Sequence, residues 1–348
     1  MQLQVDLFTV NKRVPLTISR GTTAQTTNVW VRVQHDGIEG WGEASPFSVD
    51  NQPQTTELIF AKFQQIAPLL AEVSPLDRQK IEWLLRDLAL PSAVYTGLDL
   101  ALHDWLGKSV GLPLWQLWGL DRSQIVPTSV TIGIGTPAAA QQRMQQWLEL
   151  GKIKAVKVKL GNPAGVEADR AMLRAVMEVA PAHAKFSVDA NGGWSVEEGI
   201  AMSHWLADQG VTYIEQPLPR GREVVLPIFY QESPLPIFVD ESCFNSQDIP
   251  KLADRVHGIN IKLMKSGGLT EALRMVHAAQ AHGLQIMFGC YSDSALSNTA
   301  AAQLAPFATH LDLDSHLNLR DDPFQGASFE AGVLMPNELP GLGVVAAS

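Results

Sequence analysis

The sequence Lys157-Val158-Lys159 begins a stretch, ending at Asp314, in which short apolar runs are repeatedly followed by a charged residue. The later phrases of this kind are Val188-Asp189-Ala190-Asn191, Ile214-Glu215-Gln216-Pro217, Val239-Asp240-Glu241-Ser242 and Asn260-Ile261-Lys262. From Asp189 onward their charged residues stand about 22 to 26 positions apart, which is the length of one strand and one helix with short loops. The pattern therefore predicts that these side chains project from one rim of a parallel sheet.

Strands and helices are expected to alternate from Pro127 to about residue 320. Apolar runs predict strands near residues 128–132, 155–160, 186–190, 212–215, 237–240, 258–262, 285–289 and 310–314. Helical periodicity lies between them, for example at Pro137–Leu150, Val166–Val179, Ser195–Gln209, Thr270–His282 and Ser294–Leu304. Eight strands with seven intervening helices predict an α/β fold, a modified TIM barrel of the (β/α)7β type. No eighth helix is expected, because Asp321-Asp322-Pro323 breaks the chain.

The first 120 or so residues have a different pattern, typical of a small antiparallel sheet followed by helices. Polar and apolar residues alternate in Leu3–Val10 and Val29–Gln34, whereas the threonine-rich segment Leu16–Thr27 has no periodicity and is interpreted as a mobile loop. We divide the chain into an α+β domain at 1–124, the barrel at 125–320, and a segment at 321–348 that packs back on the first domain.

Composition narrows the class of protein and its partners. Of 348 residues, 46% are hydrophobic and 18% are charged, and no apolar run is long enough for a bilayer. The formal charge of −10 argues against nucleic acid as a partner. The first residues lack the features of a signal peptide, and two cysteines are too few for a disulfide framework. We expect a cytoplasmic enzyme of small molecules, with homo-oligomer formation left open.

Three of the rim residues have the chemistry of metal ligands. Asp189, Glu215 and Asp240 follow three consecutive predicted strands, so their carboxylates should converge. Carboxylates at such close range repel each other unless a cation lies between them. Ligands that are all oxygen favour Mg²⁺ or Mn²⁺ over zinc. An octahedral ion would keep about three positions for water or for a substrate carboxylate.

Lysines are expected on both sides of this cluster. Lys159 ends the second predicted strand and Lys262 the sixth, so they face each other across an eight-membered ring. A like-charged neighbour (Lys157), a dication and desolvation would each lower the pKa of Lys159 toward that of a base. Two such groups suit removal of the proton α to a carboxylate and its return from the opposite face, which is racemisation or epimerisation.

These phrases, together with Leu263-Met264-Lys265-Ser266-Gly267-Gly268, Gly40-Trp41-Gly42-Glu43 and Gly111-Leu112-Pro113, resemble the enolase superfamily, and within it the muconate lactonizing enzyme subgroup. The resemblance spans nearly the whole chain and implies an N-terminal capping domain and one Mg²⁺ per subunit. It implies Lys159 and Lys262 as the acid/base pair of an enediolate mechanism. It also implies Asp189, Glu215 and Asp240 as metal ligands, and Lys157 as a residue that helps hold the substrate carboxylate.

The end of the eighth predicted strand, His310-Leu311-Asp312-Leu313-Asp314, is similar to the dipeptide epimerases. In that group the paired aspartates hold the α-ammonium of the first residue, and epimerisation occurs at the second. Asp312 and Asp314 suit this role because two carboxylates aimed into a site attract a cation. The resemblance also implies that Thr131 contacts the substrate. Asp293 stands where relatives often carry Glu, so we expect it near the substrate with a shorter reach.

Several alternatives remain open from the sequence. An N-acylamino acid racemase or an o-succinylbenzoate synthase would use the same lysines and metal without needing two aspartates, and a non-catalytic metal-binding barrel would use neither lysine. Lys157 has a second interpretation, as an ion-pair partner of a neighbouring acid. Asp312 and Asp314 could instead cap structure at the end of the barrel. Strand parity predicts that Asn191 and Asn260 bond to the ligands, whereas Lys265 has the opposite parity and is interpreted as a surface or outer residue. The side chains of the dipeptide are not predicted.

Overall fold

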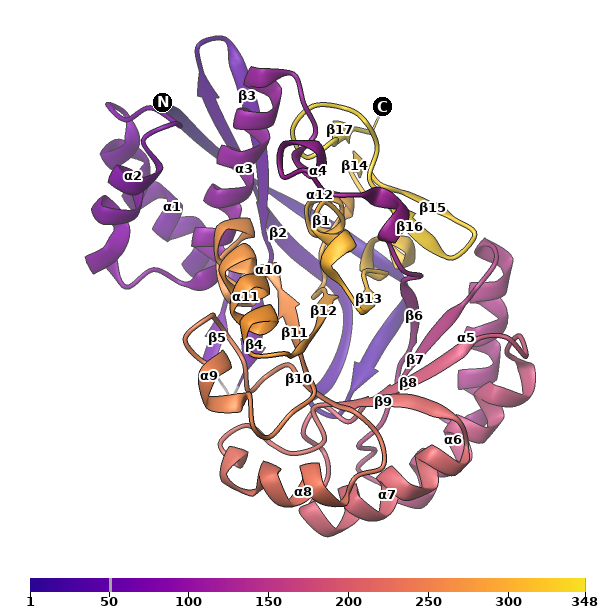
Figure 1. Cartoon of the computed structure of the whole chain (residues 1–348). Helices are drawn as coiled ribbons and strands as arrows, with labels where there is room; N and C mark the ends of the chain where they lie inside the picture. Colours follow the sequence, from indigo (N-terminus) through magenta and orange to yellow (C-terminus); the bar gives the residue numbers. More distant parts are fainter. Residues whose placement is uncertain (50–51, 348) are drawn as a thin grey trace.

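The computed structural model describes residues 1–49 and 52–347. Its centre is an eight-stranded parallel sheet that curls into a barrel (Figure 1), in the order β13-β12-β11-β10-β9-β8-β7-β6. The strands are β6 (Ser129–Ile132), β7 (Ala155–Lys159), β8 (Lys185–Asp189), β9 (Val211–Glu215), β10 (Ile237–Val239), β11 (Gly258–Lys262), β12 (Gln285–Gly289) and β13 (His310–Asp312). A parallel bridge between Thr128 and Leu311 joins the two ends of this sheet. The predicted barrel is confirmed.

Helices cover the outside of the barrel. They are α5 (Pro137–Leu150), α6 (Val166–Val179), α7 (Val196–Asp208), α8 (Leu226–Glu232), α9 (Ile249–Leu252), α11 (Leu269–Ala281) and α12 (Ala295–Ala302), with a single turn, α10 (Leu263–Ser266), directly after β11. The predicted bounds of α5 and α6 are confirmed, and Thr136 caps α5 by accepting a hydrogen bond from the Ala139 amide at 3.2 Å. After β13 the chain forms a 3-10 turn at Ser315–Asn318 in place of an eighth helix.

Alternation along the strands separates the apolar residues from the charged ones. In β7, Val156 and Val158 are buried in the apolar layer shared with the helices, so Lys157 and Lys159 point into the barrel. The other strands follow the same rule. Tyr213, Phe238 and Met287, each at the centre of its strand, form an apolar cluster inside the barrel. The charged residues lie at the carboxyl ends of the strands.

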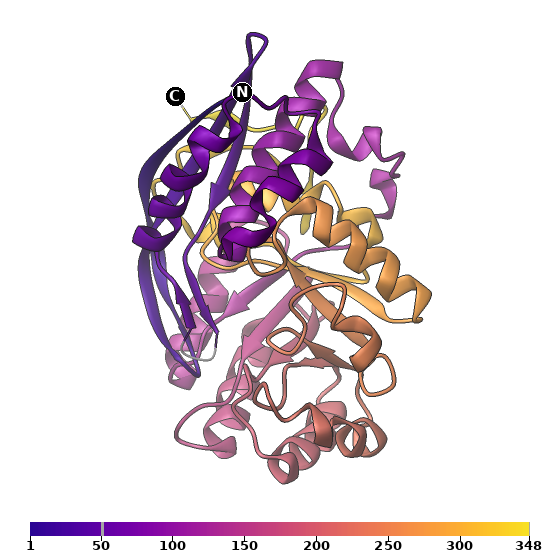
Figure 2. The same ribbon diagram turned by 90° about the vertical axis from the view of Figure 1, so that its left-hand side faces the viewer.

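An antiparallel sheet and three helices form the N-terminal part (Figure 2). These are β1 (Gln2–Ile18), β2 (Gly21–His35), β3 (Ile38–Ala44), α1 (Thr56–Leu70), α2 (Arg78–Leu85) and α3 (Ser92–Val110), with the short elements β4 (Phe47–Val49), β5 (Gln52–Gln54) and α4 (Leu114–Leu117). Among residues 1–49 and 52–347, no helix combines the length and apolar character needed to cross a bilayer.

The prediction of a loop at Leu16–Thr27 is wrong. The ladder between β1 and β2 continues from Leu16 opposite Thr23 to Ile18 opposite Gly21, and the chain turns at Ser19 and Arg20. Threonine stabilises this extension, since the hydroxyls of Thr17 and Thr22 lie 2.8 Å apart across the strands. The hairpin tip touches the barrel rim, where Ser19 Oγ donates to Asn191 O at 3.3 Å.

The C-terminal segment lies against the N-terminal part of the chain. It contains the paired strands β14 (Phe324–Gln325) and β17 (Val345–Ala346), and β15 (Ser328–Glu330) and β16 (Val333–Met335). The Phe324 ring packs edge-on against Phe8 and Trp30, at 5.4 and 5.2 Å between centroids. The amide of Leu342 donates to Asp104 on α3 at 2.8 Å. The domain boundaries at 124 and 320 stay predictions.

Candidate active site

Strand register brings the three predicted metal ligands to one rim. Asp189 at the end of β8 is paired in the ladder with Glu215 at the end of β9, and Glu215 is paired with Phe238 on β10. Asp240 follows two residues after Phe238, so it projects from the same side of the sheet. All three side chains are buried. The convergence that the spacing predicts is therefore present in the backbone.

Each of these carboxylates faces a lysine ammonium. Lys159 Nζ lies 2.6 Å from Asp189 Oδ2, and Lys262 Nζ lies 2.7 Å from Asp240 Oδ2. Lys157 Nζ lies 2.5 Å from Glu215 Oε2. The two predicted acid/base groups thus flank the acidic cluster from β7 and β11, which stand four strands apart in the barrel.

Burial and neighbouring charges shift the pKa values of these groups in opposite directions. Burial, and then the charge of Asp189, raise the pKa of Glu215 to about 7. Burial would also raise the pKa of Asp240, but Lys262 and Lys265 outweigh it and hold that pKa well below its usual range. Burial would lower the pKa of Lys262, yet the charge of Asp240 raises it well above the ordinary value. Lys262 is therefore held in its protonated form.

The donor set fits a hard divalent cation in its chemistry. Three buried carboxylates come from consecutive strands, and burial together with the charge of Asp189 raises the pKa of Glu215, as expected where carboxylates converge. Within the described ranges, no three acidic, histidine or cysteine side chains already have the arrangement of ion ligands. The reason is that each of the three carboxylates is turned toward a lysine. Binding an ion would require these side chains to turn.

Amides hold two of the ligands in place, as parity predicts. Asn260 Nδ2 donates to Glu215 Oε1 at 2.8 Å. The main-chain N–H of Asn191 donates to Asp189 Oδ1 at 2.8 Å, and its side-chain nitrogen lies 3.2 Å from Asp189 Oδ2. These bonds fix the carboxylates at the ends of β8 and β9 without occupying the mouth of the barrel.

Lys265 does not lie on the surface. The sequence analysis interprets it as a surface or outer residue, and the first of these two positions is wrong. Its Nζ donates to Asp240 Oδ1 at 2.6 Å, to Asp240 O at 2.5 Å and to Asn260 O at 3.0 Å, and its side chain is 0% exposed. The reason is α10, whose single turn begins right after Lys262, so strand parity no longer applies and the side chain turns back under β10.

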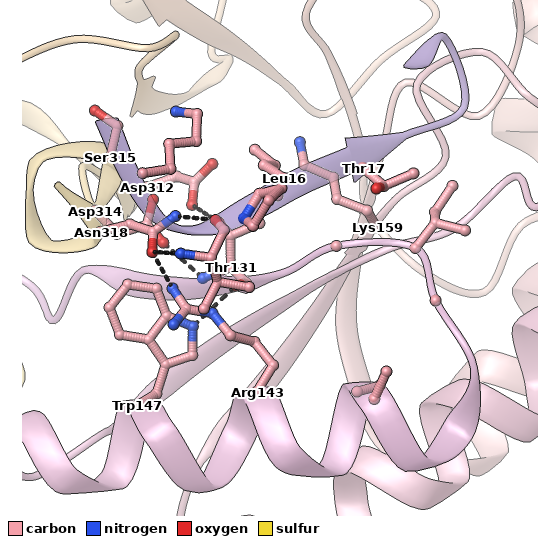
Figure 3. Close-up of a pocket in the computed structure, with 18 of the residues that line it drawn as sticks. Leu16, Thr17, Thr131, Arg143, Trp147, Lys159, Asp312, Asp314, Ser315 and Asn318 are labelled. Atoms are coloured by element: carbon pink, nitrogen blue, oxygen red, sulfur yellow. Dashed lines mark hydrogen bonds between the residues drawn. The ribbon is translucent and has the colours of Figure 1, made fainter. Parts of the chain in front are cut away.

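A cavity of about 160 Å³ opens beside the cluster and is lined by Lys159, Thr131, Asp312 and Asp314 (Figure 3). The main-chain N–H of Thr131 donates to Asp314 Oδ2 at 2.6 Å, and its hydroxyl donates to Asp312 Oδ1 at 3.2 Å. The structure therefore brings together Thr131 and the two aspartates of the Asp-x-Asp sequence. Cys290 also lines this cavity.

The two aspartates differ in charge state and in free hydrogen-bonding capacity. Burial would raise the pKa of Asp312, but Lys157 and Lys159 lower it to about 2, and Lys157 Nζ lies 2.8 Å from its Oδ2. Burial, and then Asp312, raise the pKa of Asp314 to about 6. Among the described residues only Thr131 donates to the carboxylate of Asp314. Asp314 is the one with an oxygen left for a ligand.

Asp293 and Lys157, two residues predicted to contact the substrate, are bound to other protein groups. Asp293 accepts hydrogen bonds from the hydroxyl of Ser45 and, at 3.0 Å, from the amide of Tyr291, and it does not line the cavity. Lys157 is fully buried among Glu215, Asp312 and Asp189, the last at 3.4 Å. These contacts favour the structural interpretation of Lys157. Both roles as substrate ligands stay predictions.

Two cationic residues of the cavity wall carry no signal in the sequence. Lys12 comes from β1, far from the barrel in the chain, and Arg143 from the second turn of α5. Neither follows a barrel strand, so rim spacing could not find them. The helical stripe of α5 is a weak signal at most for Arg143, because long charged side chains are common on exposed helix faces.

Comparisons with known proteins agree with this geometry. Residues 139–347 match the family model described as "Enolase C-terminal domain-like", and residues 2–119 match "Mandelate racemase / muconate lactonizing enzyme, N-terminal domain". The chain is 43% identical to a hydrophobic dipeptide epimerase from Flavobacteria bacterium (strain MS024-2A) over 99% of this chain and 97% of the relative.

Solved structures give the same result. The substrate-liganded L-Ala-D/L-Glu epimerase from Bacillus subtilis superposes with a TM-score of 0.93 at 26% identity, covering 100% of this chain and 99% of that one. The dipeptide epimerase from Enterococcus faecalis V583 in complex with Mg and L-Leu-L-Tyr has a TM-score of 0.91 at 31% identity, covering 99% and 98%. The chain belongs to the mandelate racemase / muconate lactonizing enzyme family of the enolase superfamily.

Proposed function

We propose that this protein is a Mg²⁺-dependent dipeptide epimerase, which also accepts Mn²⁺, acting at the α-carbon of the C-terminal residue. The observation that carries the proposal is the pair Lys159 and Lys262, whose ammonium groups flank one buried acidic cluster from opposite sides of the barrel. The relatives described above, which are named dipeptide epimerases, support the reaction class.

Asp189, Glu215 and Asp240 would hold one divalent ion per subunit, and a bound ion would stabilise negative charge developing on the substrate carboxylate. All three are buried carboxylates on adjacent strands, which is the donor chemistry that Mg²⁺ prefers. Lys159 and Lys262 each share a carboxylate with this site. Both lysines therefore lie directly beside the site proposed for the ion.

The two lysines divide the proton transfer between them. In one direction, neutral Lys159 takes the α-proton from one face of the carbon and becomes an ammonium ion. Lys262, in its protonated form, then donates its proton to the opposite face and becomes neutral. In the reverse direction the roles exchange. One C–H bond breaks and one forms, so the product differs from the substrate only in configuration.

Asp312 and Asp314 would anchor the α-ammonium of the dipeptide, with Thr131 keeping both aspartates in position. Asp314 supplies the free oxygen, whereas Asp312 is already engaged by Lys157 and by Ser129, whose hydroxyl lies 2.7 Å from Oδ1. A carboxylate pair at one end and an ion site at the other match the two charged ends of a dipeptide. A substrate with an acylated amine has no group for this pair.

Exchange of the α-proton in ²H₂O tests the proposal. The wild-type enzyme with Mg²⁺ should incorporate deuterium at the C-terminal α-carbon of both epimers. Lys159→Ala should lose exchange of one epimer by at least about a hundredfold while keeping that of the other, and Lys262→Ala should show the opposite pattern. NMR of each epimer measures both rates.

Lys80→Ala is the matched control, because Lys80 is an exposed residue of α2. This variant should exchange the α-proton of both epimers at the wild-type rate. Equal residual exchange of the two epimers in either active-site variant would contradict the two-base scheme. No exchange on any of a broad panel of dipeptides would contradict the function itself.

A further inference from the structure

Lys12 reaches the cavity because the β1–β2 ladder is interrupted. Pairing is regular up to Asn11 opposite Gln25 and resumes only at Leu16 opposite Thr23. Between these points β1 bends away from β2, and Lys12 instead forms an antiparallel bridge with Leu319, close to the end of β13. Irregularities of this kind re-aim a side chain, and here the side chain is aimed at the barrel mouth.

Among the described residues, the Lys12 ammonium has no partner. The residue is 6% exposed and lines the cavity, yet within residues 1–49 and 52–347 no side chain or carbonyl forms a hydrogen bond or ion pair with it. Burial lowers its pKa, although the charges of Cys290, Asp314 and Asp293 oppose this. A buried cation without a partner is unfavourable unless a ligand or water supplies an acceptor.

The surrounding wall is also cationic. Arg143 on α5 stacks over Trp147 at 3.9 Å and donates to Asn318 Oδ1 at 2.9 Å, and its guanidinium faces the same cavity from the opposite side to β1 (Figure 3). Val14 and Leu16 supply apolar surface in the same cavity. The cavity is suited to a short apolar stem that ends in an anionic group.

Charge balance favours an anion once a dipeptide is bound. In the arrangement proposed above, the substrate ammonium occupies the free oxygen of Asp314, which is one of the acids nearest Lys12. That contact adds a positive charge to a cavity that already holds Lys12 and Arg143. The side chain of the first residue branches from the same carbon as the ammonium, so it enters this cavity. An anionic side chain there would replace the negative charge of Asp314 that the substrate ammonium neutralises.

We propose that Lys12 selects dipeptides whose first residue carries a side-chain carboxylate, with Arg143 as the second cation of that subsite. This inference rests on the proposed function and deepens it by naming the substrate class. The subsite would take L-Glu or L-Asp at the first position and place no requirement on charge at the second.

Isosteric substrates test the inference. The ratio of kcat/KM for L-Glu-L-Leu to that for L-Gln-L-Leu compares a carboxylate with an amide of the same shape. We expect the wild-type enzyme to favour the glutamyl substrate by about tenfold, as for a charge-assisted hydrogen bond. Lys12→Met should bring the ratio to about one, mainly by raising the KM of the glutamyl substrate.

Lys80→Met is the matched control and should keep the wild-type ratio. A wild-type kcat/KM ratio of one or less for the glutamyl over the glutaminyl substrate would overturn the inference. This measurement needs no variant, so it decides the matter even if Lys12→Met does not fold. An unchanged ratio in folded Lys12→Met or Lys12→Gln would overturn it as well. If dipeptides with Gln or Leu at the first position are epimerised with the same efficiency as the glutamyl dipeptide, only the proposed subsite is wrong. If no dipeptide is epimerised, the proposed function is wrong too.

Discussion

Lys265 stabilises the fold through Asp240, and its loss should therefore be costly even though it is not a proposed catalytic group. Its three donors are all directed at protein acceptors in a site without solvent access. Lys265→Met keeps much of the side-chain volume but removes one cation from a buried cluster. We expect it to lower the free energy of unfolding by about 3 kcal/mol, measured by urea titration.

Lys251 provides the comparison for that measurement. It pairs with Asp248 at 3.5 Å, but its side chain is 74% exposed, so Lys251→Met should change the free energy of unfolding by less than about 0.5 kcal/mol. Similar losses in both variants would mean that the Lys265 contacts add nothing beyond those of a surface ion pair.

At the residue scale, position along a strand decides what the sequence can predict. Asp189, Glu215 and Lys262 end barrel strands, so repeated spacing and parity were sufficient to bring them to one rim. Lys265 and Lys12 fall outside regular strands, one in the turn of α10 and the other at the irregularity of β1. Parity has no meaning at such points, and these are the residues whose surroundings the sequence did not predict.

At the element scale, the β1–β2 hairpin shows why a lack of periodicity does not indicate a loop. Alternation is visible only where one face of a strand is buried and the other is not. Gly21–Gln25 is exposed, so it carries no pattern, yet residues of this stretch pair with β1 on both sides of the irregularity. Arg20 at the tip forms an ion pair with Glu241 at 2.7 Å, which ties the hairpin to the barrel rim.

Strand β13 gives a prediction about pH, because His310 at its start packs inside the barrel. The ring lies 4.2 Å from Tyr213 and 5.2 Å from Phe238 between centroids. Burial, and then the charge of Lys185, lower the pKa of His310 to about 4. Between about pH 6.5 and 4 the unfolded chain binds a proton that the folded chain refuses, so stability falls as the pH falls.

We expect this group to remove about 2 kcal/mol from the free energy of unfolding between pH 7 and pH 4.5, allowing for its partial exposure. His310→Phe keeps an aromatic ring against Tyr213 and should lose that part of the pH dependence. Urea titrations at the two pH values measure it. His282→Phe, on the exposed end of α11, should retain the wild-type difference. If both variants follow the wild type, His310 is not the group responsible.

At the scale of the whole molecule, the joints between segments far apart in the chain were beyond the reach of sequence patterns. Glu43 on β3 accepts hydrogen bonds from the amides of Ser294 and Ser297, at 3.0 and 3.1 Å, and so caps α12 of the barrel. Gly42 lies so close to α3 that an added Cβ would stand 2.0 Å from Gly97 O. Both contacts join segments far apart in the chain, and spacing within one segment carries no information about them.

Asp104 on α3 tests how far these joints hold the C-terminal segment in place. One carboxylate oxygen accepts the Trp41 amide at 2.8 Å and the Lys108 ammonium at 2.7 Å, and the other accepts the Leu342 amide at 2.8 Å. Asp104→Ala would leave two amides without partners, one in β3 and one in the C-terminal segment. We expect a loss of about 3 to 5 kcal/mol in the free energy of unfolding.

Limited proteolysis separates a local effect from a global one. If Asp104 anchors the C-terminal segment, cleavage after residue 320 should become faster in Asp104→Ala under conditions where the barrel stays intact, because the segment loses a fixed point on α3. Asp254→Ala removes an exposed carboxylate whose partner is the adjacent Arg255, so it should leave both stability and cleavage unchanged. Cleavage that begins only once the whole chain unfolds would mean that the segment and the barrel form one cooperative unit, and that Asp104 stabilises that unit as a whole.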